Sequence, residues 1–450
     1  CLCGMTILAL MVGVARRHGV HVLTAWGFML LVSHNLIAFF PVRPQLLSFM
    51  WFALLLVVLD RAFGRWVEEK KIRIAWLWWA PLILAVWTNS HGAFVAGLCI
   101  LLAYLAGRSL ELLVTRGHAA WPTVAHLAAV GLVSAAATLL NPYGADLLLW
   151  LAQSLGQPRP EITEWAPPRP SDPIFIPLVL LLGTMIAAFV GTRRRRDWTQ
   201  MAILLLVTWQ ACSHLRHIAF LALLCGFWLP VPLHSAISRL RPQNKGQLPV
   251  MRLSPWMART VTIALAAAIG LLSIGLVDRW RDFPVARDRY PVDALQFMHN
   301  HRLEGRLVVS FNWAQYAIAA LGDRIDVAFD GRFRTCYPQE IVDMHFDFLL
   351  GENGGNRQRS ANSGPIDGRR VLEFGEPNLV LVDRSYPESV HVMHAEVLSG
   401  NSEWTILYQD GTAQLWGRRD RYDEPGSPHF LARAERILTN SKFTSLEQWP

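Results

Sequence analysis

Two histidines and one arginine share a short turn between two apolar segments of the sequence. His214, Arg216 and His217 fall within a stretch of four residues. Cationic side chains donate strong hydrogen bonds to phosphate, and the planar guanidinium group does so through two parallel bonds. The turn therefore predicts either a phosphate-binding site or an anchor at a membrane–water boundary. The two histidines could also ligate a metal, but no set of Cys, His and carboxylate residues at ligand spacing completes such a site.

Other polar residues interrupt the apolar sequence at intervals. In chain order they are His34-Asn35, Arg43-Pro44-Gln45, Asn89-Ser90-His91-Gly92, Asn141-Pro142-Tyr143-Gly144, and Glu161 with Glu164-Trp165. Polar groups are costly in a bilayer, so each group is a candidate for function. Each also has a structural explanation, because such residues form turns, end helices, snorkel to the interface or bond a backbone carbonyl. Glu161 and Glu164 are the carboxylates that could act as a general base beside these groups.

Long apolar segments separate these polar residues and must position them. The chain has 450 residues, 52% of them hydrophobic and only 17% charged, whereas soluble domains carry about 25% charged residues. A helix needs about 20 mostly apolar residues to cross ~30 Å of hydrocarbon. We therefore predict a polytopic α-helical membrane bundle of about ten spans. The spans are expected near residues 1–15, 21–40, 44–59, 74–89, 92–110, 121–140, 174–191, 198–213, 217–233 and 260–277.

The loops between these spans alternate in basic content. One set of loops holds 18 Lys and Arg residues and the other set holds four. Cytoplasmic loops are the basic ones, so the tail after residue 277 is expected outside the cytoplasm and the polar groups at the outer membrane face. The cytoplasmic loops are expected to carry only simple basic clusters. Because an apolar run opens the chain at Cys1 and would run inward, we expect at least one earlier span in an amino-terminally longer protein.

The net charge of +8 is divided unevenly along the chain. Residues 1–277 hold 22 Lys and Arg against 9 Asp and Glu, whereas residues 278–450 hold 20 against 25. The basic excess lies in the apolar part, which favours membrane topology and not a nucleic-acid partner. Six Cys in 450 residues are too few for a disulfide-framework protein. The expected organisation is a transmembrane domain at 1–277, a soluble extracytoplasmic α/β domain at 278–419 and a peripheral tail at 420–450.

The soluble part alternates between helical and strand patterns, which predicts a small α/β sandwich. Helices are expected at 292–302, 312–321, 338–350 and 389–398, strands at 306–311, 324–329 and 379–382, and a hairpin at 404–416 around Asp410-Gly411. Residues 351–368 are polar and rich in Gly, Asn and Ser, which predicts a mobile loop.

The soluble part contains no complete catalytic motif. It has neither a Gly-x-Ser-x-Gly elbow nor a phosphate-binding loop. Asp330-Gly331-Arg332, beside Trp313 and Tyr316, could bind a sugar or a neighbouring loop, or could form a structural turn with an ion pair. Cys336 is expected to be inert.

The polar groups between the spans, taken in their order, resemble a known membrane family. Arg43-Pro44-Gln45, Asn89-Ser90-His91-Gly92, Asn141-Pro142-Tyr143-Gly144, Glu161 to Trp165 and the Arg216-His217 turn are similar to motifs of bacterial GT-C-type polytopic glycosyltransferases. That group includes the RgtA/B/C/D-like and dolichyl-phosphate-mannose mannosyltransferase-like proteins. The resemblance covers about residues 1–280, and the tail resembles the carboxy-terminal domains of many members.

The resemblance implies sugar transfer from a polyprenyl-phosphate donor to a glycan, lipid or protein acceptor on the outer side of the cytoplasmic membrane. The family uses an acidic residue of its first outer loop as catalytic base. The loop around Arg43 has no Asp or Glu, so the main acid is expected upstream, with Glu161 and Glu164 as further candidates. The donor phosphate would be held by Arg43, His214, Arg216 and His217. The site would be lined by His34, Asn89, His91, Asn141, Tyr143 and Trp165.

Two other functions remain open on the sequence. A catalytically inactive relative would lack the upstream acid. A transporter or flippase would predict charged residues within the membrane or broken helices in paired halves, and the sequence displays neither, nor an internal repeat. The sugar, the acceptor and the use of a divalent metal are not predicted.

Overall fold

The chain folds into two compact units in the computed structural model. They comprise Cys1–Gln247 and Leu248–Pro450, and each is described by itself. The structure describes residues 2–41, 43–69, 71–155, 162–240, 284–353, 357–398, 403–442 and 446–448, with scattered residues from 254 to 277. The predicted domain boundary at residue 277 falls where few residues are described, and it stays a prediction.

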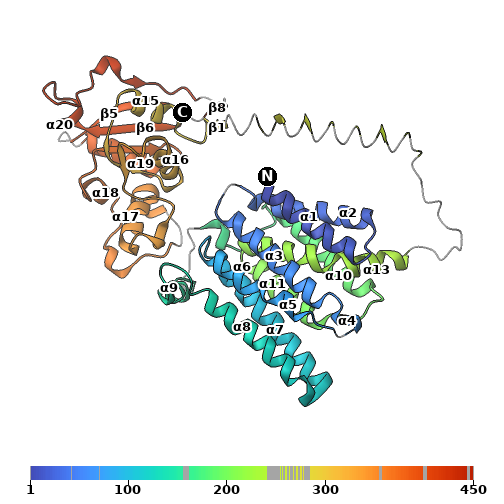
Figure 1. The fold of residues 1–450 in the computed structure, drawn as a ribbon. Coiled ribbons are helices and arrows are strands. Elements are labelled where there is room, and N and C mark those ends of the chain that lie inside the picture. Colours follow the sequence, from blue (N-terminus) through green and yellow to red (C-terminus); the bar gives the residue numbers. More distant parts are fainter. Residues whose placement is uncertain are drawn as a thin grey trace. The chain divides into compact units, whose positions relative to one another are not determined.

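The first unit is a bundle of helices (Figure 1). Its α-helices are α1 (Leu2–Arg17), α2 (Val22–Leu36), α3 (Gln45–Phe63), α4 (Trp66–Glu69), α5 (Ile74–Leu77), α6 (Trp79–Thr88), α7 (Phe94–Arg116), α8 (Trp121–Ala137), α9 (Ala145–Leu155), α10 (Phe175–Gly191), α11 (Trp198–Ser213), α12 (Ile218–Trp228) and α13 (Pro230–Leu240). Short 3-10 turns include η1 (Ile37–Phe39), η2 (Gly117–Ala120), η3 (Thr163–Trp165) and η4 (Leu215–His217). Helices occupy nine of the ten positions predicted for spans, and the tenth, 260–277, lies largely outside the described residues.

Apolar helices of sufficient length indicate that the protein is membrane-associated. Within the described residues, three helical runs are long and apolar enough to cross a bilayer: Val22–Phe39, Gln45–Glu69 and Phe94–Ala137. A bent pair, Leu215–Trp228 with Pro230–Arg239, would make a fourth. Other apolar helices, such as Phe175–Gly191, have only 10–17 residues. At about 1.5 Å per residue they fall short of ~30 Å of hydrocarbon, so the predicted ten spans are not confirmed.

The helical unit contains one bent helix pair, which bears on the alternative of a transporter. The axes of Leu215–Trp228 and Pro230–Arg239 differ by 59°. Pro230 has no backbone N–H and its ring disfavours continuation of the preceding helix, which explains the bend. Within the described residues this is a single bent pair, and it does not by itself recreate the paired broken helices of transporters.

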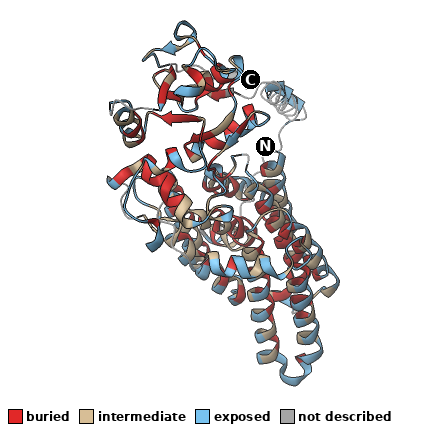
Figure 2. Ribbon diagram, turned by 90° about the vertical axis from the view of Figure 1, so that its left-hand side faces the viewer, coloured by how far each residue is buried: buried red, intermediate tan, exposed pale blue. Residues whose placement is uncertain are grey.

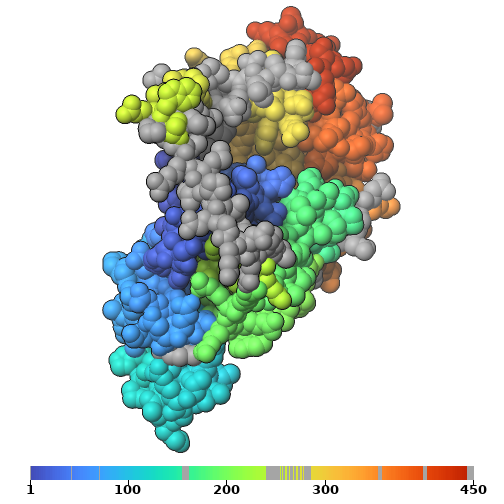
Figure 3. Space-filling model, turned by 90° about the vertical axis from the view of Figure 1, so that its right-hand side faces the viewer, coloured from blue at the N-terminus to red at the C-terminus, as the bar shows by residue number. Residues whose placement is uncertain are grey.

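The helical unit packs around aromatic side chains and leaves apolar residues on its surface. Phe52 lies edge-to-face against both Trp87 and Phe220, with centroid separations of 6.2 and 5.2 Å. The hairpin of α7 and α8 projects from the rest of the unit (Figures 1 and 3). Exposed large apolar residues such as Leu132 and Leu205, both 72% exposed, are suited to contact lipid.

The second unit is an α/β sandwich. Its strands are β1 (Pro284–Ala286), β2 (Gly305–Val309), β3 (Ile325–Val327), β4 (Leu379–Asp383), β5 (Trp404–Gln409), β6 (Ala413–Arg418), β7 (Ile437–Leu438) and β8 (Leu446–Gln448). Its α-helices are α15 (Val292–Asn300), α16 (Phe311–Leu321), α17 (Gln339–Leu350), α18 (Arg370–Glu373), α19 (Pro387–Leu398) and α20 (Arg419–Tyr422). The main sheet has the order β3-β2-β4-β6-β5-β7, and β1 pairs with β8. The predicted helices, strands and Asp410-Gly411 hairpin are thus confirmed.

The central strands of this sheet are largely buried (Figure 2), and their side chains pack into two separate clusters. Leu307 and Val309 pack in one cluster with residues of α15 and α16. Val308 packs in a second cluster with residues of α17, α18 and α19. β2 lies parallel to both β3 and β4. A parallel strand covered on both faces is apolar throughout, which explains the run from Leu307 to Val309.

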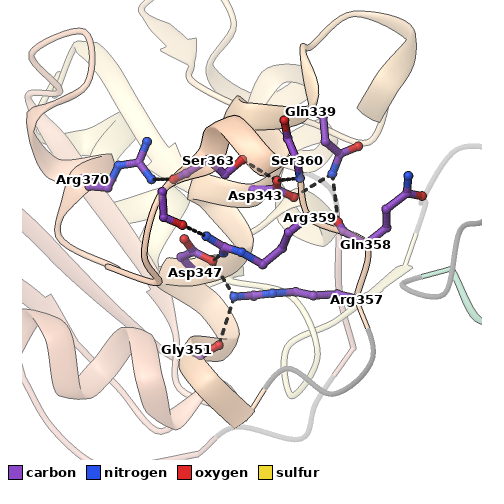
Figure 4. A network of polar contacts seen from close by, with 11 residues as sticks. Gln339, Asp343, Asp347, Gly351, Arg357, Gln358, Arg359, Ser360, Ser363 and Arg370 are labelled. Carbon is purple, nitrogen blue, oxygen red and sulfur yellow. Dashed lines mark hydrogen bonds and ion pairs between the residues drawn. The ribbon is translucent and has the colours of Figure 1, made fainter.

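The predicted mobile loop is largely fixed onto α17 (Figure 4). Arg357 and Arg359 both pair with the buried Asp347. Asp343 accepts hydrogen bonds from the Ser360 backbone N–H, at 2.7 Å, and from the Ser363 hydroxyl, at 2.6 Å. The prediction is therefore wrong for residues 357–364, because two carboxylates of α17 hold them. Residues 354–356 lie outside the described part.

The Asp330-Gly331-Arg332 segment forms the structural turn that the sequence left open. Arg332 Nε lies 2.9 Å and Nη2 2.6 Å from Asp330 Oδ2. Burial of the Asp330 carboxyl would raise its pKa, but the hydrogen bonds from Arg332 outweigh burial and hold the pKa below its ordinary value. Trp313 is also engaged, since its indole N–H donates to the Arg289 carbonyl oxygen at 2.9 Å.

Candidate functional site

Residues from separate loops of the helical unit gather at one end of its helices. The site, termed here the histidine–arginine cluster, comprises Arg43, His91, Glu164, Trp165, His214, Arg216 and His217. The short turns η3 and η4 lie side by side at its centre. The Leu215 N–H of η4 donates to the carbonyl oxygen of Ala166, the residue after η3, at 3.0 Å. This bond joins segments about 50 residues apart in the chain.

Aromatic and cationic rings stack across these two turns. The Arg216 guanidinium lies over the Trp165 ring, 4.6 Å from its centroid. His214 meets Trp165 edge-to-face at 5.7 Å, and His217 lies 5.4 Å from His214. A guanidinium over an indole face gains a cation–π attraction of about 0.5–2 kcal/mol. Trp165 therefore holds Arg216 in place while the guanidinium N–H groups at its rim keep their hydrogen-bonding capacity.

Arg43 joins the cluster through Glu164. Arg43 Nη1 lies 2.8 Å from Glu164 Oε1. Both side chains are partly exposed, at 59% and 40%, so the pair contributes little to stability. Its effect is positional, because it ties the loop before α3 to η3. The structure thus gives Glu164 a cationic partner, and the prediction that it acts as a catalytic base stays a prediction.

His91 approaches the cluster from the turn between α6 and α7. Its Nδ1 accepts from the Ala93 N–H at 3.2 Å and lies 2.9 Å from the Ser48 hydroxyl. Because the backbone N–H must donate, Nδ1 is an acceptor and the ring proton resides on Nε2. The Trp87 indole N–H donates to the Ser48 hydroxyl oxygen at 2.8 Å, which extends this series of hydrogen bonds. Burial, and secondarily the positive charge of Arg216, lower the pKa of His91, which favours the neutral ring at pH 7.

Several residues predicted to line the site have structural contacts elsewhere. Asn89 donates from its amide to the carbonyl oxygens of Ala85 and Leu140, both at 2.7 Å. Asn141 bonds the backbone of its own turn, including the Tyr143 N–H at 2.8 Å. These two asparagines act as turn and helix-end residues, which is one of the alternatives that the sequence left open.

The remaining predicted residues have no documented contact with the cluster. Within the described part of the chain, no contact joins the exposed His34 or the 70%-exposed Tyr143 to it. Asn35, beside His34, is buried and donates to the Pro177 carbonyl oxygen at 3.0 Å. Glu161 lies outside the described residues.

The arrangement of the cluster is suited to an anion. It brings two arginines and three histidines together with a single described carboxylate, that of Glu164. Charge-assisted bonds from the two guanidinium groups can hold phosphate oxygens, and neutral histidine rings can donate a ring N–H. Among the described residues, no group of three or more His, Cys, Asp or Glu side chains could hold a metal ion.

A second polar region lies at the opposite end of the same helices. Ser48, in the first turn of α3, contacts the cluster, whereas Asp60 near the end of α3 contacts His18 at 2.7 Å. Twelve residues of helix separate the two positions by about 18 Å. Cavities of about 480, 550 and 260 Å³ there share His18 and Arg194. Together they are termed the basic cavity.

The basic cavity corrects the expectation that these loops carry only simple basic clusters. Asp60 pairs with Arg17 and with His18, and Glu68 pairs with Arg194 at 2.9 Å. The sequence did carry a signal, since Asp60 directly follows an apolar run and an acid at the end of a span is costly unless paired.

A buried arginine beneath this cavity also escaped the sequence analysis. Arg108 of α7 has 1% of its side chain exposed and pairs with Asp197 and with Glu111. Its guanidinium donates to the Tyr104 hydroxyl at 2.6 Å. Asp197 also caps α11, accepting from the Gln200 N–H at 3.0 Å. A network that crosses from α7 to α11 depends on tertiary packing, and no local sequence pattern predicts it.

Comparison with known proteins identifies no relative from which a function could be inferred. No family model matches the chain, and no curated protein matches it.

Proposed function

We propose that the protein is a membrane glycosyltransferase that takes a sugar from a polyprenyl-phosphate donor at the histidine–arginine cluster. The observation that carries this proposal is the convergence of Arg43, His91 and the His214–His217 turn on one end of an apolar helical unit. A donor anchored in the bilayer brings its phosphate to the membrane surface. Cationic groups must meet it there, because unpaired charge in hydrocarbon is costly.

The chemistry of transfer assigns a role to each part of the cluster. As the sugar–oxygen bond breaks, negative charge grows on the departing phosphate, and preorganised donors stabilise it. Arg216, held against Trp165 at 4.6 Å, is such a donor, with His214 and His217 beside it. A carboxylate base must accept the proton of the acceptor hydroxyl. Glu164 is the candidate among the described residues of the cluster, while its contact with Arg43 also supports a positioning role.

The proposal includes a location and an orientation. The protein would be a multi-pass protein of the bacterial cytoplasmic membrane, with the cluster and the α/β unit on the outer side. The support is the separation of charge within the helical unit, since the basic cavity collects loops rich in arginine. Such loops favour the cytoplasm. Shorter apolar helices such as α10 would cross as parts of the bundle.

Transfer by membranes containing radiolabelled polyprenyl-phosphate sugars tests the function. We expect Arg216→Ala to lower the transfer rate about tenfold or more, because charge-assisted hydrogen bonds are worth roughly 1.5–3 kcal/mol. Arg169→Ala is the matched control, since Arg169 is an exposed arginine close to the cluster in sequence. Equal transfer by wild type and Arg216→Ala would refute the phosphate-holding role, and no transfer by wild type would refute the proposed activity.

Two observations support a flippase as a second candidate. The helical unit contains a helix pair bent by 59° and the buried charge of Arg108, and transporters commonly use such features. A flippase would move fluorescent polyprenyl phosphate between the leaflets of reconstituted vesicles without forming a glycoside. Movement without transfer, abolished by Arg108→Ala, would favour this candidate over the transferase.

A further inference from the structure

The basic cavity gathers far more cations than acids. Among the described residues that line its three parts are ten Lys and Arg side chains and three carboxylates. The carboxylates are Asp60, Glu68 and Asp197. The cations are Arg17, Arg61, Arg65, Lys71, Arg73, Arg193, Arg194, Arg195, Arg196 and Arg239. They come from four separate loops or helix ends, which the fold brings to one place.

Several of these cations have no acidic partner. Within the described ranges, no carboxylate pairs with Arg73, Arg193, Arg195 or Arg196. Crowding of like charge is also evident at Arg17. Burial lowers the pKa of Arg17, and the charges of Arg61 and Arg73 lower it further. Uncompensated positive charge around a hollow raises the local concentration of anions.

The cavity walls limit the kind of anion that fits. One side is apolar and aromatic, with Phe63, Phe227 and Trp228. The parts of about 480 and 550 Å³ lie in the size range of small-molecule sites and are too small for a nucleic-acid duplex. Nine of the ten cations are arginines, whose fork of N–H donors matches phosphate oxygens.

The geometry points to a binding site for a phosphate monoester in the basic cavity, distinct from the histidine–arginine cluster. Arg194, which lines all three parts, and Arg195 bind the phosphate oxygens. The His18–Asp60 pair, 2.7 Å apart, also lines the cavity. The aromatic wall would take an attached hydrocarbon chain if the phosphate belongs to a lipid. This inference does not depend on the proposed transferase activity.

Binding of two probes to the full-length protein in uncharged detergent tests the site. The probes are radiolabelled inorganic phosphate and dioleoyl phosphatidate, with dioleoyl phosphatidylcholine as the lipid that has no monoester. We expect Arg194→Gln and Arg195→Gln to weaken binding at least tenfold. The matched control is Arg116→Gln, which removes an exposed arginine that lines none of the cavity. Arg216→Ala tests whether the probe binds at the cluster instead.

The outcomes separate the sources of the phosphate and the two sites. Phosphatidate binding with much weaker phosphate binding identifies a lipid headgroup, whereas comparable binding of both identifies a soluble phosphate. The proposal is overturned if neither probe binds better than phosphatidylcholine. It is also overturned if Arg116→Gln weakens binding as much as Arg194→Gln, or if affinity follows Arg216 alone. Arg195→Gln tests binding with little risk of misfolding, because Arg195 has no described acidic partner that the substitution would leave unpaired.

Discussion

Arg108 carries a positive charge in the interior of the helical unit. Its side chain is 1% exposed and pairs with Asp197 and Glu111. Removing one partner of a buried ionic network costs about 3–5 kcal/mol, because the remaining charges lose their compensation. We expect Arg108→Ala to lower the thermal unfolding midpoint in detergent by several degrees. Arg116→Ala, on the exposed end of the same helix, should leave it nearly unchanged, and equal midpoints for the two variants would contradict this role.

His345 couples the stability of the α/β unit to pH. Its ring stacks on Phe329 at 4.6 Å, and its Nδ1 lies 3.0 Å from the Ile341 carbonyl oxygen. Burial lowers the pKa of His345 to about 4, below the ordinary value of about 6.5. The folded state therefore resists protonation that the unfolded state accepts. The contribution of His345 to stability is present above pH 6.5 and is lost as pH falls from about 6.5 to about 4.

The free energy of unfolding is expected to fall by about 3 kcal/mol at most, because each unit of difference between the folded and unfolded pKa values of His345 is worth about 1.4 kcal/mol. Hydrogen exchange of peptides from β2 and α17 in the full chain, measured at pH 7 and pH 5, reports this unit alone. We expect His345→Phe to show a smaller loss of protection on acidification than wild type. The same loss in both proteins would show that other groups cause the acid sensitivity.

At the scale of elements, α17 holds a segment that its own sequence would leave loose. Residues 357–364 are polar and lack apolar periodicity, so the sequence predicted a mobile loop. Their partners, Asp343 and Asp347, lie 10 to 20 residues earlier and are buried only in the folded unit. By contrast, β2 and β4 were predicted because apolar runs between turn residues are a local signal. Local patterns determine the elements, whereas long-range polar contacts fix the loops.

The anchoring of this segment predicts its resistance to protease. Trypsin cleaves after arginine, and Arg357 and Arg359 both pair with Asp347. We expect Asp347→Ala to raise the rate of tryptic cleavage after these two residues about tenfold or more, since charge-assisted bonds are worth about 1.5–3 kcal/mol each. Glu376→Ala, an exposed acid of the same unit, is the control. Unchanged cleavage in Asp347→Ala would show that Asp347 does not hold the segment.

At the scale of the whole molecule, the sequence predicts one polar region of the helical unit, whereas the other becomes evident only in the fold. The cluster was predicted because Arg43, His91 and Arg216 interrupt apolar runs at alternate loops. The basic cavity is lined by loops and helix ends that are far apart in sequence and come together only in the fold. The predicted ten spans are not confirmed, since composition does not show where a helix ends or bends. Pro230 is one such position.

The sidedness of these two regions is the property on which the proposed transferase depends. Helix α3 places Ser48 beside the cluster and Asp60 beside the basic cavity, so a bilayer crossed by α3 would separate the two regions. In a cysteine-free background, single cysteines at Arg169 and Tyr143 should react with an impermeant maleimide in intact cells. A cysteine at Arg116 should react only after the membrane is permeabilised. Cys336, which the sequence predicts to be inert, is exposed in the α/β unit, so its thiol should be labelled like the first two when restored alone. If cysteines at positions 116 and 169 were labelled from the same side, the histidine–arginine cluster and the basic cavity would not lie on opposite sides of the membrane. That result would also exclude a site that meets its lipid-borne donor on the outer face.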